Sequence, residues 1–198
     1  MKKFITHVGM DTDSRGFDIA IAEGFGSDNH EVRGLGRIPA TLAAVDKLIK
    51  QLRKQGYQEL RFVYEAGPCG FGLYRHLKGR EGINCAVIAP SKIPKKPGER
   101  VKTNRRDAQK LAQLDRGGNL EAIYVPSEED EAMRDLSRGR AAAVAAATRV
   151  KQQLKSLLLR HGIKYAGTGE SWSGDYRKWL VGLHLPHEAQ EYVLAEGL

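Results

Sequence analysis

The order in which strand-like and helix-like segments follow one another limits the possible folds of this chain more than any other sequence feature. Residues 4–10, 17–22 and 31–38 are apolar or alternate with period two, and short segments rich in Gly, Asp and Ser separate them. Short connections cannot form a parallel crossover, so these three segments predict an antiparallel meander.

From residue 41 onward, helical and extended patterns alternate. Apolar residues recur at helical spacing over 42–52, with Thr41 as the candidate N-cap, and again near 73–77. A short apolar strand follows each helix, at residues 60–64 and 85–89. Strand–helix–strand connections are right-handed crossovers between parallel strands. The sequence therefore predicts an α/β fold with a mixed sheet and flanking helices.

Positive charge is concentrated in one segment. The chain carries 32 Lys and Arg against 24 Asp and Glu, a net charge of +8, and residues 90–116 alone hold nine basic and three acidic residues. This concentration favours a polyanionic partner, above all nucleic acid, over the alternative of a solvated lysine-rich loop. A helix is predicted over residues 103–114. The basic residues expected to contact nucleic acid are Lys92, Lys95, Lys96, Arg100, Lys102, Arg105, Arg106 and Lys110.

A long helical pattern follows an expected short strand at residues 122–125. Acidic residues after Ser127 favour a helix start, and an apolar stripe continues to about residue 161, roughly 35 residues or about 50 Å of helix. Such a helix packs either on a second copy, giving a homodimer or higher oligomer, or as a brace within its own chain. The predicted divisions are a sheet domain at 1–126, the long helix at 127–165 and a short helical segment at 166–198.

Four polar residues have the chemistry and the predicted positions of ligands for a divalent metal ion. Asp11 follows the first strand, Glu65 follows the fourth, and Asn104 and Asp107 lie three residues apart on the predicted helix. If the first and fourth strands are neighbours, both carboxylates meet at the sheet edge where α/β folds place ligands. Taken singly, Asp11 is typical of a turn residue. Together, these oxygen ligands suit Mg²⁺ or Mn²⁺ and predict a divalent metal site for phosphodiester chemistry.

Three segments also resemble a known family. The first strand ending in GMD, then YEAGPCGFGLYRHL and GERVKTNRRDAQKLA, resemble the RuvC-like N-terminal domain of the DEDD insertion-sequence transposases, the IS-one-ten family, over about residues 5–161. The resemblance implies an RNase H-like core, DNA strand cleavage and exchange, and a structured guide RNA as partner. Carried across by position, the four acidic ligands of the family fall on Asp11, Glu65, Asn104 and Asp107.

The chain departs from that family in two respects. Asn104 stands where the family has a carboxylate, so affinity for a second Mg²⁺ is expected to be weaker; Asp13 and Asp115 are open as substitutes. The family also has a C-terminal domain with a nucleophilic serine, for which 198 residues leave no room. Ser171 and Ser173 lie in a turn-rich stretch and are interpreted as loop residues. We expect either an N-terminal domain cut from a longer protein or a naturally shortened member.

Composition excludes several other classes. Two cysteines are too few for a disulfide framework, and there is neither a signal peptide nor an apolar run that would span a membrane, so we expect a cytoplasmic protein with no membrane partner. Three functions stay open: the RuvC-like domain of an RNA-guided transposase, a non-catalytic module that binds guide RNA or DNA and dimerises, and a nuclease similar to Holliday-junction resolvases.

Overall fold

A computed structural model describes residues 5–24, 31–94, 103–167 and 172–198 of the chain. The chain divides into two compact units, Met1–Val125 and Pro126–Leu198. The first unit holds a sheet with helices on both faces, and the second is helical. Each unit is described by itself below.

The sheet of the first unit is mixed, as predicted. Its strand order is β3-β2-β1-β4-β5. The pairs β1–β2 and β2–β3 are antiparallel, whereas β1–β4 and β4–β5 are parallel. The meander thus occupies one side of the sheet and the crossover strands the other. The strands are β1 (Ile5–Asp13), β2 (Gly16–Glu23), β3 (Arg33–Ile38), β4 (Glu59–Glu65) and β5 (Ile83–Ile88).

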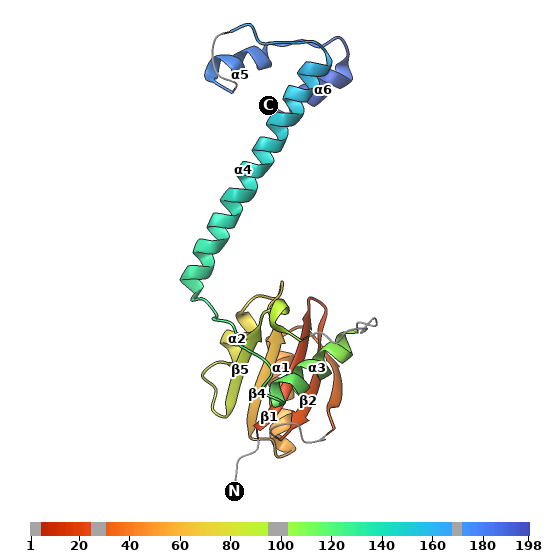
Figure 1. The fold of residues 1–198 in the computed structure, drawn as a ribbon, viewed down its shortest axis with the longest axis vertical. Coiled ribbons are helices and arrows are strands. Elements are labelled where there is room, and N and C mark those ends of the chain that lie inside the picture. Colours follow the sequence, from red (N-terminus) through yellow and green to blue (C-terminus); the bar gives the residue numbers. More distant parts are fainter. Residues whose placement is uncertain (1–4, 25–30, 95–102, 168–171) are drawn as a thin grey trace. The chain divides into compact units, whose positions relative to one another are not determined.

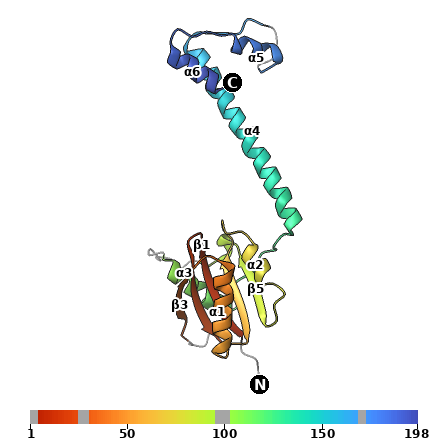
Figure 2. The same ribbon diagram turned by 180° about the vertical axis from the view of Figure 1, so that it is seen from behind.

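Helices cover both faces of this sheet. The helices α1 (Leu42–Lys54) and α2 (Gly72–Leu77) pack on one face, where they enclose the main core (Figure 2). The helix α3 (Asn104–Arg116) packs on the other face (Figure 1). Thr41 caps α1 as predicted, since its side chain accepts a hydrogen bond from the Ala44 backbone nitrogen at 3.2 Å.

Small residues let α3 approach the sheet closely. Ala20 and Ala22 of β2 pack against Ala108 and Ala112 of α3. Beneath the same helix, a Cβ atom added at Gly9 of β1 would lie 2.6 Å from the backbone nitrogen of Ala112, and closer still to the Ala108 carbonyl oxygen. Only glycine fits at this point of β1.

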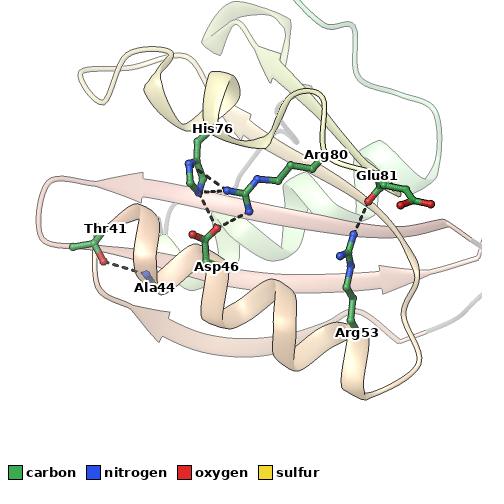
Figure 3. Close-up of polar contacts among 7 residues, drawn as sticks. All are labelled: Thr41, Ala44, Asp46, Arg53, His76, Arg80 and Glu81. Atoms are coloured by element: carbon green, nitrogen blue, oxygen red, sulfur yellow. Dashed lines mark hydrogen bonds and ion pairs between the residues drawn. The ribbon is translucent and has the colours of Figure 1, made fainter.

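Polar contacts tie α1 to α2 on the opposite face (Figure 3). Oδ1 of Asp46 lies 2.8 Å from Nε2 of His76 and accepts a hydrogen bond from Arg80 at 2.6 Å. The hydrogen bonds with His76 and then Arg80 hold the pKa of Asp46 below its ordinary value. Nη2 of Arg53 also donates to the backbone carbonyl of Glu81. These contacts fix α1 against the segment that leads into β5.

The expected strand at residues 122–125 is wrong in extent. Its only pairing among the described residues is an isolated antiparallel bridge between Ala122 and Ile88, supported by a hydrogen bond from the Ile123 nitrogen to the Val87 carbonyl. Tyr124 is 76% exposed. Pro126, which has no N–H to donate, follows the segment 122–125. The segment runs along the β5 edge without extending the sheet.

The second unit consists of a 33-residue helix with two short helices. The long helix α4 (Glu128–Arg160) begins at Ser127, whose side chain accepts a hydrogen bond from the Asp130 nitrogen at 3.1 Å, and closely matches its predicted length. Within the described ranges, no helix is both long and apolar enough to cross a membrane. The short helices α5 (Gly174–Val181) and α6 (Glu188–Glu196) share a core with the end of α4: Leu154, Leu157, Leu158, Tyr176, Leu180, Leu185 and Leu194.

Candidate metal-binding site

The sheet places Asp11 and Glu65 on neighbouring parallel strands. The register between β1 and β4 runs to the pair Met10 and Tyr64, so Asp11 and Glu65 are the next residues along each strand. β4 ends at Glu65, whereas β1 continues to Asp13 and pairs there with β2. Asp11 therefore lies within a strand and not after it, because the hairpin with β2 extends β1 past the acid.

The first turn of α3 brings the polar pair to the same edge. Thr103 caps the helix, its side chain accepting a hydrogen bond from the Arg106 nitrogen at 3.4 Å. Asp107 is the acidic residue of the first turn, where the positive end of the helix dipole favours a carboxylate. Asn104 and Asp107 line a cleft of about 550 Å³ together with Asp11.

Glu65 stands apart from the other three candidate residues. It is half-buried at the end of β4, and the β4 side of the cleft is lined by Pro68 and Cys69 from the following loop. Among the described residues, no three His, Cys, Asp or Glu side chains lie close enough to hold a metal ion as they stand. Carboxylates repel one another, so a close cluster of three is unfavourable unless a cation or a proton offsets the charge.

Asp107 provides the test of whether the residues fit a cation. Its Oδ2 atom is buried and makes no hydrogen bond with any described residue. A buried carboxylate oxygen without a partner is costly, and a cation would offset that cost. The neighbouring donors, the Asp11 carboxylate and the Asn104 amide oxygen, are hard oxygen ligands that suit Mg²⁺ or Mn²⁺. The donor chemistry of the cleft therefore fits a divalent ion.

Two further acids lie beside the cleft. Asp13 lines it and accepts hydrogen bonds from Ser14 and Arg37, which hold the pKa of Asp13 below its ordinary value. Asp18 of β2 is the register partner of Asp11 and lies 3.4 Å from Nη1 of Arg37. Sequence reasoning missed Asp18, although it alternates with Ala20 and so shares the α3 face of β2.

Asp115 is excluded as a substitute for Asn104. It lies in the last turn of α3, at the far end from Asn104, and is bound to His7 at 2.6 Å and to Arg61 at 2.9 Å. Its carboxylate is thus already occupied. His7 is 3% exposed, so its side chain is packed inside the fold and bound to Asp115.

The predicted nucleic-acid contacts fall into three groups. Arg105 and Arg106 are exposed on the first turn of α3, and Lys110 is half-buried on the second. Lys92 forms an ion pair with Glu121 at 2.8 Å. The remaining four, Lys95, Lys96, Arg100 and Lys102, lie outside the described residues.

Comparisons with known proteins agree on one family. Residues 8–163 match the model of the DEDD transposase family of the IS110 (IS-one-ten) insertion sequences. A protein named as transposase y4qE from Sinorhizobium fredii is 45% identical over 96% of this chain and 47% of its own length. The transposase for insertion sequence element IS1533 from Leptospira borgpetersenii is 37% identical over 92% of this chain and 51% of its own. The chain spans about half the length of these curated relatives.

Solved structures are similar at low sequence identity. Thermus thermophilus RuvC covers 60% of this chain at 9% identity with a TM-score of 0.41, and the same protein in complex with a Holliday junction substrate gives 8% and 0.40. The predicted fold class is confirmed by the family match and by the sheet, whose three antiparallel strands followed by two parallel ones are the RNase H-like (RuvC-like) arrangement. The chain belongs to the DEDD transposase family of the IS110 insertion sequences.

Proposed function

We propose that this chain is the metal-dependent DNA-cleaving part of a transposase, and that Asp11, Glu65, Asn104 and Asp107 form its catalytic and metal-binding site. The observation that carries the proposal is the buried Oδ2 of Asp107, which makes no hydrogen bond with any described residue, in a cleft shared with Asp11 and Asn104. When bound there, Mg²⁺ or Mn²⁺ would polarise a DNA phosphate and stabilise the charge that develops on its oxygens.

The residues of the cleft differ in the charge that they offer to a cation. Asp11 and Asp107 supply negative oxygens, whereas Asn104 supplies a neutral amide oxygen, which binds a cation more weakly. Arg105 and Arg106, exposed on the same turn of α3, counter the repulsion between these acids and a DNA backbone. The basic residues thus attract the phosphate that the acids alone would repel.

The partners of the whole protein follow from the same proposal. DNA and a structured guide RNA would contact the basic residues of 92–110. A second copy would pack on α4, where Met133, Leu136 and Val144 are each more than half exposed. We also propose that the chain acts in the cytoplasm. Strand exchange would require a further serine-bearing domain, and the relatives are about twice as long as this chain.

Nicking of DNA separates this proposal from a second candidate, a non-catalytic module that binds nucleic acid and dimerises. The second candidate is favoured by Asn104, which removes one charge from the cleft. We expect the chain to nick supercoiled or branched DNA with Mn²⁺, and Asp11→Asn to lose that nicking while it still binds DNA. Binding of RNA without any nicking would support the second candidate, and nicking confined to four-way junctions would favour a resolvase-like nuclease.

The salt dependence of nucleic-acid binding tests the role of the basic residues. Each neutralised phosphate releases counterions, so the affinity falls steeply with salt, by about 0.9 in log–log slope per phosphate on duplex DNA. Replacing Arg105 and Arg106 by Gln is therefore expected to reduce the slope by about 2, as measured by fluorescence anisotropy on a labelled duplex.

The matched control removes the same charge from α1. Lys47→Gln with Lys50→Gln also lowers the net charge by two, and both residues are exposed on the helix that covers the opposite face of the sheet. In this double variant, the slope of log affinity against log salt concentration is expected to equal that of the unsubstituted chain. An equal change in both double variants would show that net charge, not the α3 turn, determines binding.

A further inference from the structure

The helix that carries Asp107 is anchored at its other end by a buried carboxylate. Asp115 hydrogen bonds to Nδ1 of His7 at 2.6 Å, and Nε of Arg61 donates to both of its oxygens, at 3.0 and 2.9 Å. The side chain of Asp115 is 2% exposed and that of His7 is 4% exposed. His7 and Arg61 are register partners on β1 and β4. One carboxylate of α3 is therefore bound to two neighbouring strands.

Much of the remaining contact between α3 and the sheet is apolar. Ala108 and Ala112 face Gly9, Ala20 and Ala22, and Leu111 packs against Val63, Ala86 and Ile88. Apolar contacts have no preferred direction, so they hold the helix close to the sheet but specify its position along the strands less strictly than hydrogen bonds do. Hydrogen bonds to a buried charge do have a direction, and their geometry specifies a single alignment.

The lengths of the two elements make that alignment relevant to the cleft. From Asp115 back to Asp107 is eight residues of helix, about 12 Å at 1.5 Å per residue. From His7 to Asp11 is four residues of strand, about 13 Å at 3.3 Å per residue. Because α3 crosses β1 at Gly9 between these points, the bond between Asp115 and His7 determines where along β1 the Asp107 end of the helix lies.

We propose that Asp115 is a positioning residue, held by His7 and Arg61. It determines where along β1 the Asp107 carboxylate lies relative to Asp11. The hydrogen bonds of Asp115 are to His7 and Arg61, neither of which lines the cleft, so Asp115 acts through the position of α3. The consequence for metal binding rests on the proposed function, whereas the consequence for the placement of α3 does not.

The experiment measures both consequences in Asp115→Asn, which keeps the shape of the side chain and removes its charge. Amide hydrogen exchange is expected to become about tenfold faster along α3 relative to α1, because the ordered alignment is lost. The Mn²⁺ affinity is expected to fall about tenfold, as for the loss of other contacts that support a metal site. Unchanged exchange along α3 would overturn the proposal.

Two further variants separate positioning from general destabilisation. Val45→Ala removes core volume under α1, on the opposite face of the sheet, and is expected to speed exchange in α1 while the Mn²⁺ affinity stays natural. If Asp115→Asn does not fold, Arg61→Gln removes one of the two partners of Asp115 at a side chain that is 30% exposed, and is expected to shift both readouts in the same direction, by less. A natural chain that binds no Mn²⁺ would overturn the proposed function, and the exchange result would still decide the role of Asp115.

Discussion

Titration of Mn²⁺ into the Asn104→Asp variant is expected to give an affinity at least about tenfold higher than that of the natural sequence, because the attraction between opposite charges a few ångströms apart exceeds 1.4 kcal/mol even at an effective dielectric constant near 20. Desolvation of the new carboxylate opposes part of this gain. Asp107→Asn changes the charge by one unit in the other direction, and its affinity is expected to fall at least about tenfold for the same reason. Isothermal titration calorimetry measures both.

Gln51→Glu is the matched control for the first variant. Gln51 is exposed on α1, which covers the opposite face of the sheet, so this substitution adds the same charge without adding a ligand to the cleft, and the Mn²⁺ affinity is expected to stay unchanged. If Asn104→Asp and Gln51→Glu raised the affinity equally, the metal would be responding to net charge, and the cleft would not be its site. If Asp107→Asn bound Mn²⁺ as the natural chain does, the buried Oδ2 would have no part in metal binding.

The expected changes in Mn²⁺ affinity, a rise in Asn104→Asp and a fall in Asp107→Asn, bear on the activity of the unsubstituted chain. The proposed site has one carboxylate fewer than the four acidic ligands that the resemblance implies, and the neighbouring acids are already engaged, Asp13 by Arg37 and Asp115 by His7 and Arg61. Neither of these two is available to replace the missing charge without breaking its own ion pair. A gain of nicking in Asn104→Asp would therefore identify weak metal binding as the limit on the natural activity.

Local sequence patterns were sufficient to predict the architecture. The mixed sheet follows from connection lengths, since a short turn permits only an antiparallel neighbour and a helix permits a parallel one. The first turn of α3 was also predictable, because a cap and a charged residue at fixed spacing are local signals. By contrast, the end of β1 was misplaced at Asp11, since the hairpin with β2 depends on pairing that β1 alone does not reveal.

The contacts that align the elements were not predictable from the sequence. Asp115 is 108 residues from His7 and 54 from Arg61, and no periodicity links residues at such separations. Asp18 was missed for a related reason, because its place opposite Asp11 depends on the register of the hairpin. Sequence patterns therefore pointed to three residues that line the cleft, Asp11, Asn104 and Asp107, but not to the contacts that align α3 with the strands.

Replacing Gly9 by Ala is expected to lower the free energy of unfolding by about 3 kcal/mol, near the top of the range for overpacked cores. The added Cβ would overlap the backbone of α3 at Ala108 and Ala112, and a backbone contact cannot be relieved by rotating a side chain. The helix must therefore move away from β1, which also lengthens the hydrogen bonds of Asp115. Chemical denaturation followed by circular dichroism measures the stability.

Gly72→Ala provides the comparison for this substitution. A Cβ at Gly72, the first residue of α2, would have no atom within 4 Å, so the same chemical change is expected to leave stability within about 0.5 kcal/mol of the natural value. Displacement of α3 in Gly9→Ala also carries Asp107 away from Asp11, so the Mn²⁺ affinity is expected to fall even where the protein stays folded. A destabilised Gly9→Ala protein with natural Mn²⁺ affinity would show that the metal site does not depend on how closely α3 packs on β1.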